Sequence, residues 1–536
     1  MTRAPGRHGA GMFLRSTERK PVMTRPVPTA LLLREGDDVA VAVRSLRAGD
    51  TIAVGGNEIR IRQDIPAGHK LAVHSVPEDG AVHKYGQIIG FARSGIEAGD
   101  HIHSHNLGVK PLTLEYEYST AVPEVQYYPE TERRTFQGFK RPNGKVGTRN
   151  YLAVVSTVNC SASVTRFIAE RFRGDALKAF PNVDGVIGIK HGTGCGMNVA
   201  GADLRMLERT LAGHARHANV AGYILMGLGC ETNQASTMIQ NTGLLSIGTP
   251  TSNPIVVTIQ AEGGVTKAVE RGVREIEKLL PYANSFTRST QPISEIFVGT
   301  NCGGSDGNSG ITANPAVGWM TDELVRNGST SVLAETTETY GAEHLLTRRA
   351  VSREVGEKLV ALMRWWEKYT AMHGAEIDNN PSPGNKAGGL TTIYEKSMGA
   401  MAKGGNGPLV DVLQYAEAIK SRGFLFMDTP GHDPVSVTGL VAGGCNVIVF
   451  TTGRGSVFGC KPAPSIKVST NTPLFEHMSD DMDLDAGSIL EGASVADVGR
   501  ALFEKVISVA SGERTKSEIH GIGDEEFDPW LIGATL

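Results

Sequence analysis

From residue 136 onwards, short runs of apolar and β-branched residues alternate with longer stretches of helical spacing. The runs lie at 151–156, 183–189, 222–226, 296–298, 331–334, 423–427 and 447–450, and helical stretches lie at 163–172, 199–211, 265–280 and 355–369. Continuous apolar strands that alternate with helices are typical of a parallel sheet covered on both faces. The pattern therefore predicts an α/β fold. A break near 281–292 divides it into a middle αβ domain over 136–285 and a C-terminal αβ domain over 286–536, with a Rossmann-like, mostly parallel sheet.

The residues before this region follow other patterns. Short alternating runs between 27 and 112 are separated by glycine turns, which predicts a small β-rich domain. Residues 113–135 carry five glutamates and two prolines without a clear period, and we expect an extended acidic linker. Residues 1–26 are basic and lack the apolar core of a secretory signal. We expect them to form a disordered extension.

Charge and cysteine content narrow the classes of function. The chain has 53 Lys and Arg against 57 Asp and Glu, and its net charge of −4 argues against nucleic-acid binding by the whole protein. No run approaches the roughly 18 apolar residues of a transmembrane helix, so no membrane span is expected. Six cysteines in 536 residues are too sparse for a disulfide scaffold. We therefore expect a cytoplasmic protein with reduced thiols.

Four cysteines follow predicted strands directly. Cys160, Cys195 and Cys230 are spaced 35 residues apart, about one strand–helix unit, and Cys302 follows a later strand. Because the carboxyl ends of parallel strands line one crevice, we expect these thiols to converge. Thiolates select iron or iron–sulfur sites. The alternative is that they pack as small apolar side chains, because no pair has the CxxC spacing.

Glycine is in excess, with 65 residues, or about 12% against a usual share of roughly 7%. Many of these glycines flank the strand-end cysteines, where they let the backbone approach a ligand. The segment 192–196 lacks the G-x-G-x-x-G spacing of a dinucleotide site, and the chain has no G-x-x-x-x-G-K-[ST] motif. A nucleotide site is therefore not predicted.

Three histidines, His101, His103 and His105, alternate along the sequence HIHSHN. On a strand this spacing places all three imidazoles on one face. Imidazole is a common metal ligand and a base near neutral pH. The cluster is expected to face a ligand, by gripping substrate, by binding metal or as part of a lid.

Several longer strings resemble the altronate/galactarate dehydratase family. They are CGGSDGNSGITANP at 302–315, GLGCE at 227–231, NPSPGNKAGGLTT at 380–392, TTGRG at 451–455 and VGTRN at 146–150. The resemblance extends from about residue 28 to the C-terminus. It implies a SAF-type β-clip domain, a linker, a middle domain and an αβ C-terminal domain. It also implies dehydration of a sugar acid to a 2-keto-3-deoxy acid, with Fe²⁺ as the metal and Mn²⁺ as a possible substitute.

Dehydration removes the proton α to a carboxylate and expels the neighbouring hydroxyl. A divalent cation stabilises the enediolate that develops, and the hydroxyl needs protonation or metal coordination to leave. The expected catalytic residues are His191, Lys386 and Asp306. The expected metal ligands are Cys195, Cys230, Glu231, Cys302 and Asp306. The expected substrate-binding residues are Arg454, Asn385, Ser305, Thr452, His101, His103 and His105. Glu335 and Glu338 are further acids after a strand, with capping of the next helix as the alternative.

The leading hypothesis is an iron-dependent dehydratase of an aldonate such as altronate. HIHSHN resembles the altronate branch of the family, whereas 182–196 partly resembles the galactarate branch, so galactarate is an open alternative. A sulfo-lyase acting on a related 2-hydroxy acid and a non-catalytic sugar-acid-binding protein are the others. An iron–sulfur cluster is the alternative to a single iron ion, and the family resemblance suggests a possible homodimer.

Overall fold

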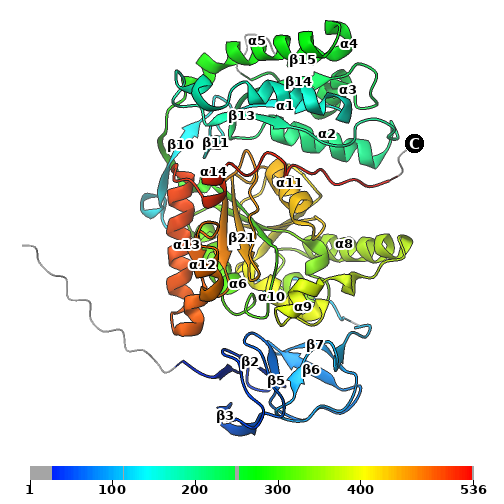
Figure 1. Cartoon of the computed structure of the whole chain (residues 1–536), viewed down its shortest axis with the longest axis vertical. Coiled ribbons are helices and arrows are strands. Elements are labelled where there is room, and N and C mark those ends of the chain that lie inside the picture. The colour runs from blue at the N-terminus through cyan, green and yellow to red at the C-terminus, as the bar shows by residue number, and fades with distance from the viewer. Residues whose placement is uncertain (1–26, 113, 248–252, 534–536) are drawn as a thin grey trace, which may run out of the picture.

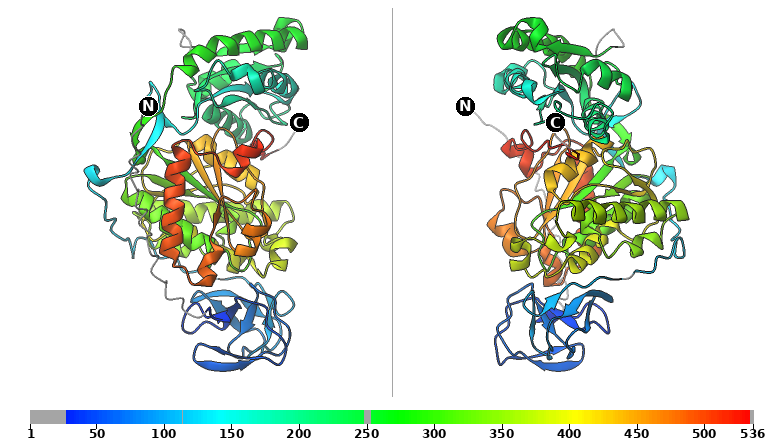
Figure 2. Two further views of the ribbon diagram at one scale, coloured as in Figure 1. Left: turned by 60° about the vertical axis from the view of Figure 1, so that its left-hand side comes forward. Right: turned by 90° about the vertical axis from the view of Figure 1, so that its right-hand side faces the viewer.

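The computed structural model describes residues 27–112, 114–247 and 253–533. The predicted disordered extension over 1–26 lies outside them. Figures 1 and 2 show a small strand-rich N-terminal domain at one end of the molecule and a middle domain at the other, with the C-terminal domain between them. The α/β class predicted from the alternating pattern is confirmed, because the C-terminal domain contains a seven-stranded parallel sheet with helices.

The N-terminal domain consists of short antiparallel strands. They are β1 (Ala30–Leu31), β2 (Val39–Ala42), β3 (Thr51–Val54), β4 (Asn57–Arg60), β5 (Lys70–Ala72), β6 (Ala81–Lys84), β7 (Gln87–Ala92), β8 (His101–Ile102) and β9 (Leu107–Gly108). They form sheets in the orders β1-β2-β5-β8, β6-β7-β9 and β3-β4. Gly55 and Gly56 join β3 to β4 with φ of 59° and 83°, the left-handed pair that a tight hairpin requires.

The predicted linker leads from this domain to the middle domain. Its described residues run along the C-terminal domain, and those before Thr135, where a strand begins, contain a single 3-10 turn, η1 (Glu130–Glu132). The Ser119 N–H donates to Thr347 O at 3.0 Å, and the Tyr128 N–H donates to Arg326 O at 2.9 Å. The segment is therefore fixed by backbone hydrogen bonds to the domain it passes.

The middle domain has a four-stranded parallel sheet in the order β13-β12-β14-β15. Its strands are β12 (Tyr151–Ser156), β13 (Gly185–Ile189), β14 (Val220–Gly227) and β15 (Ile255–Thr258), and its helices are α1 (Ala162–Glu170), α2 (Ala202–Ala215), α3 (Ala235–Thr242), α4 (Ile259–Glu262) and α5 (Val265–Asn284). Buried side chains form two cores: one includes residues of α1 and α5, and the other includes residues of α2 and α3. Both faces are apolar, as the continuous strand runs predict.

A small antiparallel sheet precedes and follows the middle domain in the chain. Strand β10 (Thr135–Lys140) pairs with β11 (Val146–Gly147) on one side and with β16 (Ser289–Pro292) on the other. Because β16 follows α5, the chain leaves the middle domain beside the point where it entered.

The C-terminal sheet has the order β19-β20-β18-β17-β21-β22-β23. Its strands are β17 (Phe297–Cys302), β18 (Thr330–Leu333), β19 (Leu409–Leu413), β20 (Phe424–Met427), β21 (Val447–Thr452), β22 (Ser465–Ser469) and β23 (Leu484–Asp485). Its helices are α6 (Ala313–Arg326), α7 (His344–Thr347), α8 (Arg353–Met372), α9 (Pro383–Ala387), α10 (Ile393–Met401), α11 (Asp433–Gly443), α12 (Thr472–His477), α13 (Val495–Ala510) and α14 (Lys516–His520). Strand β17 lies in the centre.

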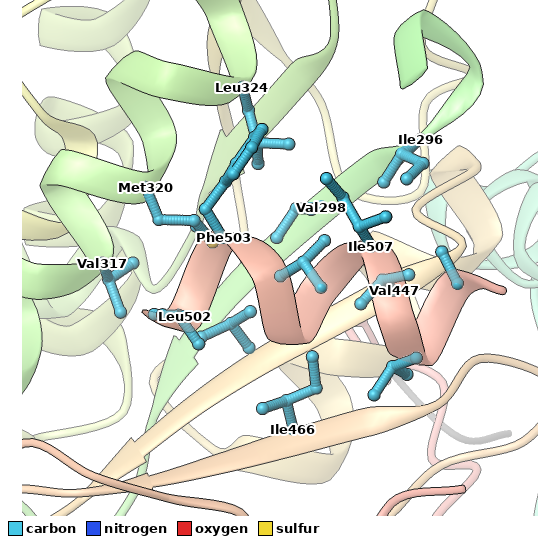
Figure 3. Close-up of a cluster of buried hydrophobic side chains, with 14 of the residues drawn as sticks. Ile296, Val298, Val317, Met320, Leu324, Val447, Ile466, Leu502, Phe503 and Ile507 are labelled. Carbon is cyan, nitrogen blue, oxygen red and sulfur yellow. The ribbon is translucent and has the colours of Figure 1, made fainter. Parts of the chain in front are cut away.

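One face of this sheet is covered by α6 and α13 (Figure 3). Val298, Val447 and Ile466 from three neighbouring strands pack beneath the apolar sides of the two helices. Phe503 of α13 is 3% exposed, and burial of such a side chain contributes about 1.5–3 kcal/mol. This core fixes β17 and β21, whose carboxyl ends carry the residues described below.

The N-terminal domain packs on the C-terminal domain through a buried ion group. The Nζ atoms of Lys70 and Lys84 lie 2.8 and 2.9 Å from the carboxylate oxygens of Glu395 on α10. Burial alone would raise the pKa of Glu395, but the two ammonium groups outweigh it and hold that pKa well below its usual range. Removing one partner of such a group leaves an unpaired buried charge at a cost of about 3–5 kcal/mol. The contact therefore fixes the position of α10.

Candidate active site

Cys302 ends β17 at the carboxyl edge of the C-terminal sheet. Its N–H donates to Glu335 Oε2 at 3.0 Å, and its thiol donates to Glu338 Oε2 at 3.3 Å. Glu335 follows the neighbouring strand β18, and Glu338 ends the 3-10 turn η5 (Thr336–Glu338). The sulfur and one oxygen from each carboxylate lie within 4.8 Å of one another, and all three residues are buried. They form a group that could hold a metal ion.

The backbone of Glu335 has a φ of 68°, in the left-handed region that non-glycine residues rarely adopt. Its N–H donates to Thr429 Oγ1 at 2.8 Å, and it makes no side-chain capping bond to η5. Strain of this kind costs about 1–3 kcal/mol and often occurs at functional sites. Glu335 Oε1 is buried and has no hydrogen-bond partner within the described chain. A buried carboxylate oxygen without a partner is consistent with a cation ligand.

Two buried lysines neutralise the two glutamates. Lys403 Nζ lies 2.7 Å from Glu335 Oε2, and Lys396 Nζ lies 2.7 Å from Glu338 Oε1. Lys396 is on α10 and Lys403 is in the following 3-10 turn η7 (Ala402–Gly404). Asn380 also donates to Glu338 Oε1, at 2.8 Å. The thiol therefore lies among two ion pairs rather than among apolar side chains.

Burial and the two glutamates perturb the ionisation of their neighbours. Burial raises the pKa of the Cys302 thiol far above its ordinary value, and the negative charge of Glu335 raises it further. Burial also raises the pKa of Asp433 at the start of α11 to about 8, and Glu335 and Glu338 add to this shift. A Cβ built on Gly303 would lie 2.3 Å from Asp433 Oδ2, so only glycine admits this approach beside Cys302. Asp433 is thus a carboxyl poised near neutral pH.

The group opens into a cavity of about 390 Å³. Cys302, Glu338, Lys396, Asp433, Asn385 and Arg454 are among the residues that line it. Arg454 is exposed and also lines a second cavity of about 730 Å³, which Pro66, Ala67 and His69 of the N-terminal domain border. The Arg454 side chain therefore lines both cavities, where the N-terminal domain meets the C-terminal domain.

Asp306 lines the second cavity and not the first. Its buried carboxylate accepts hydrogen bonds from the Thr470 hydroxyl at 3.0 Å, the Ser309 hydroxyl at 3.0 Å and the Asn308 N–H at 3.1 Å. Burial raises the pKa of Asp306, and these bonds oppose the shift. A carboxylate with this many donors holds its own loop in place, and it lies outside the group formed by Cys302, Glu335 and Glu338.

Four further predicted residues lie around the glycine-rich loops. Asn385 Nδ2 donates to Ser305 O at 2.9 Å and Asn385 lines the smaller cavity. Thr452 is buried and accepts the Gly455 N–H at 3.0 Å, so it shapes the turn that carries Arg454. Lys386 lies next to Asn385 and is partly exposed.

The predicted histidines gather at the domain contact, although β8 ends at Ile102 and the expected strand continues no further. The ring centroids of His101 lie 5.5 Å from His103 and 5.7 Å from His105. His69 joins them, with its Nδ1 3.0 Å from His101 Nε2. His103 Nε2 donates to Lys386 O at 2.8 Å. The cluster therefore contacts the loop that borders the cavities.

His191, Cys195, Cys230 and Glu231 lie in the middle domain, on a different sheet from Cys302. The structure thus does not bring the five predicted metal ligands together. His191 Nε2 donates to Ser156 O at 3.1 Å, and its Nδ1 accepts the Thr193 N–H at 3.3 Å. Burial lowers the pKa of His191 to about 4. With both nitrogens engaged, this imidazole supports its own loop.

Sequence reasoning missed Lys396, Lys403 and Asp433, and it noted Glu335 and Glu338 only as further acids. Lys396 and Lys403 are seven residues apart, two turns along one helical segment. Lysines at this spacing are usually on a solvent-exposed helix face, so the sequence did not indicate that they are buried. The one sign of burial was the surrounding sequence YEKSMGAMAKGG, in which small residues allow close packing.

The fold and the site define an α/β protein with a SAF-type N-terminal domain and a buried thiol–dicarboxylate group at a sheet edge. Three family models match the chain: the altronate/galactarate dehydratase SAF domain at residues 28–110, the D-galactarate dehydratase/altronate hydrolase second domain at 138–284, and the D-galactarate/altronate dehydratase C-terminal domain at 293–535. The chain belongs to the altronate/galactarate dehydratase family.

Individual relatives extend over nearly the whole chain. Altronate dehydratase of Bacillus subtilis is 36% identical over 509 residues, covering 94% of this chain and 99% of the relative. Altronate dehydratase of Escherichia coli is 35% identical over 484 residues, covering 90% and 95%. Galactarate dehydratase (L-threo-forming) of Escherichia coli is 38% identical over 497 residues, covering 91% and 94%. Among the described residues, no helix is long and apolar enough to cross a membrane.

Proposed function

We propose that this chain, a hydro-lyase by its family, removes water from an aldonate such as altronate to give a 2-keto-3-deoxy acid. The observation that carries the proposal is the buried group of Cys302, Glu335 and Glu338, which opens into a cavity lined by Arg454. The sequence predicted one crevice in which all four strand-end thiols converge. The proposed site instead uses the edge of the C-terminal sheet alone, together with residues of α10.

Arg454 binds the substrate carboxylate in this proposal. A guanidinium offers two parallel N–H donors to a carboxylate, whereas lysine offers a point charge. Its exposed position at the junction of the two cavities leaves it accessible to an incoming anion. The substrate hydroxyls then extend towards Cys302 and Asp433, which line the same cavity.

A divalent cation fits the donor set. One thiolate and two carboxylates suit a borderline ion such as Fe²⁺, with Mn²⁺ as a substitute, and Glu335 Oε1 has no other partner within the described chain. Lys396 and Lys403 already balance the two glutamates. A divalent ion with the Cys302 thiolate would therefore leave one positive charge, and Arg454 in the same cavity adds a second. The charge balance therefore accommodates either an aldonate or an aldarate.

When bound, the cation supplies charge stabilisation for the enediolate. The residues of the chain supply the proton transfers and the positioning. Asp433 is protonated at neutral pH and donates its proton to the departing hydroxyl, as a general acid with a raised pKa does. Lys386 is the proposed base, because its loop borders the cavity, whereas His191 lies in the middle domain with both nitrogens engaged.

The test is an anaerobic screen of the purified full-length protein with Fe²⁺ or Mn²⁺ and a panel of aldonates and aldarates. We expect a 2-keto-3-deoxy acid from an aldonate, and a smaller kcat/KM for galactarate. Sulfite release from sulfolactate would assign the chain to sulfo-lyase chemistry. Ligand-induced thermal stabilisation without product from any acid would contradict dehydration and support a binding protein.

We also propose a cytoplasmic location, which the free state of all six cysteines supports.

A further inference from the structure

Three free cysteines lie at the carboxyl edge of the middle-domain sheet. Cys160 follows β12, Cys195 follows β13 and Cys230 follows β14, and all three are exposed. In the sheet β12 lies between β13 and β14, and Ser156 pairs with Met226. Cys160 and Cys230 are thus each four residues beyond a paired position. Neighbouring strands are about 4.8 Å apart, so the three strand ends span about 10 Å.

Hydrogen bonds join the three loops beside the cysteines. The Asn159 N–H, next to Cys160, donates to Thr193 O at 2.8 Å. The Asn233 N–H donates to Gly194 O, next to Cys195, at 2.9 Å. Thr157 Oγ1 donates to the carboxylate of Glu231, next to Cys230, at 2.8 Å. Each thiol-bearing loop is therefore tied to another within a few residues of its cysteine.

Gly194 shows how closely these loops approach. It has a φ of 99°, and a Cβ at this position would lie 2.3 Å from Thr157 O. Only glycine permits this packing, which brings the loop of Cys195 against the loop of Cys160.

Asn233 supplies a second, independent observation. It is fully buried between the loops, and its Nδ2 donates to Thr157 O at 2.9 Å. Its Oδ1 is buried and has no hydrogen-bond partner within the described residues. Buried amide oxygens are rarely left without a donor, so this oxygen is available to a donor group held between the loops.

The spacing of the thiols distinguishes two kinds of metal site. A single tetrahedral ion with sulfur about 2.3 Å away holds its sulfurs about 3.8 Å apart. Among the described residues, Cys302, Glu335 and Glu338 are the only group of three or more whose thiol, imidazole or carboxylate atoms all lie within 4.8 Å of one another. At least one pair of the three middle-domain thiols is therefore more than 4.8 Å apart, which is wider than one ion requires. An iron–sulfur cluster, in which each thiolate binds a different iron, needs the wider spacing.

We propose that Cys160, Cys195 and Cys230 bind a [4Fe–4S] cluster at the carboxyl edge of the middle-domain sheet. Three thiolates leave one iron without a cysteine ligand, and that position takes an oxygen ligand such as water or a carboxylate. The site is separate from the group at Cys302, which lies on another sheet in another domain. The inference therefore goes beyond the proposed dehydration, and neither depends on the other.

The experiment uses the full-length protein, reconstituted anaerobically with Fe²⁺ and sulfide. Cys160→Ser, Cys195→Ser and Cys230→Ser are compared with the matched control Cys460→Ser, whose thiol lies in the C-terminal domain and donates to Ala463 O. We expect about four sulfides per chain and a brown visible absorbance in the wild type and in the control. Each of the three variants should lose at least half of the bound sulfide, while circular dichroism shows an unchanged fold.

Three outcomes would overturn the proposal. The first is a wild type that binds no sulfide, and the second is sulfide that is retained equally in all four variants. The third is a wild type that binds Zn²⁺ at these thiols and forms no chromophore with iron and sulfide. The substrate screen measures formation of a 2-keto-3-deoxy acid, whereas this experiment measures bound sulfide. A negative result for the cluster therefore does not affect the proposed dehydration, and the reverse also holds.

Discussion

The middle and C-terminal domains place cysteines at the same point of the same architecture, and they surround them differently. In both, thiols lie at or just beyond the carboxyl end of a parallel strand. Cys302 is 2% exposed and lies beside two glutamates that two lysines neutralise, whereas Cys160, Cys195 and Cys230 are exposed. Strand ends thus determine where a thiol lies, and the segments packed around it determine what it can bind.

The difference arises from α9, α10 and the turn after them. This segment supplies Lys396 and Lys403, and its Glu395 is held by the N-terminal domain through Lys70 and Lys84. The middle-domain edge has no buried lysine of this kind among its described residues. Its carboxylate, Glu231, accepts the N–H groups of Leu228 and Gly229 instead. Variants that change one sheet edge and leave the other intact test this difference.

The largest expected effect is on turnover at the C-terminal edge. Cys302→Ser removes the thiolate with little change of volume, and we expect kcat/KM to fall by roughly 100-fold or more, because even outer partners of metal ligands contribute 10–100-fold. Cys460→Ser retains a donor to Ala463 O and should stay within about threefold of the wild type. Steady-state kinetics with Fe²⁺ on both variants checks this. Equal turnover by the two variants would remove Cys302 from the site.

A smaller effect concerns the acid stability of the middle domain. Burial lowers the pKa of His191 and of His214 to about 4 and of His217 to about 3, from an ordinary value of 6.5. These imidazoles stay neutral in the folded chain. Because the unfolded chain takes up protons below pH 6.5, stability is complete above that pH and falls as the pH drops towards 4. For each such histidine, a fall in pKa from 6.5 to about 4 corresponds to about 3 kcal/mol of stability at neutral pH.

Hydrogen exchange of middle-domain peptides between pH 7 and pH 4.5, corrected for intrinsic exchange rates, measures this loss. We expect α2 and β14 to lose protection before α6 and α13 of the C-terminal domain. His217→Gln should flatten the pH dependence, because glutamine does not titrate. Equal loss of protection in the two domains over this range would show that the histidines do not set the difference.

The sequence predicted the strands best where nearly every residue is apolar. The predicted run 151–156 coincides with β12, and 447–450 lies within β21. It missed β22, whose buried Lys467 donates to Phe458 O and resembles a solvated residue when only the sequence is considered. Propensity and period do not report that a lysine has a buried carbonyl partner.

The candidate site, like the strands, was predictable from the sequence only in part. Cys302 and Arg454 follow predicted strands, and the rule that ligands bind at strand ends identified both. That rule does not distinguish one sheet from two, so Cys302 was grouped with thiols of the middle domain. Lys396 and Lys403 come from a helix far along the chain and reach the glutamates only after tertiary packing. No local pattern carries this information.

The most direct test of the central claim is an anaerobic Mn²⁺ titration of the metal-free protein, followed by electron paramagnetic resonance of the free ion. Mn²⁺ prefers carboxylate ligands and disfavours sites made of thiolates alone, so it reports on the C-terminal edge and not on the middle domain. We predict one ion per chain, lost in Glu338→Gln and retained in Cys195→Ser. Binding that Glu338→Gln leaves unchanged, or that Cys195→Ser abolishes, would contradict a metal site formed by Cys302, Glu335 and Glu338.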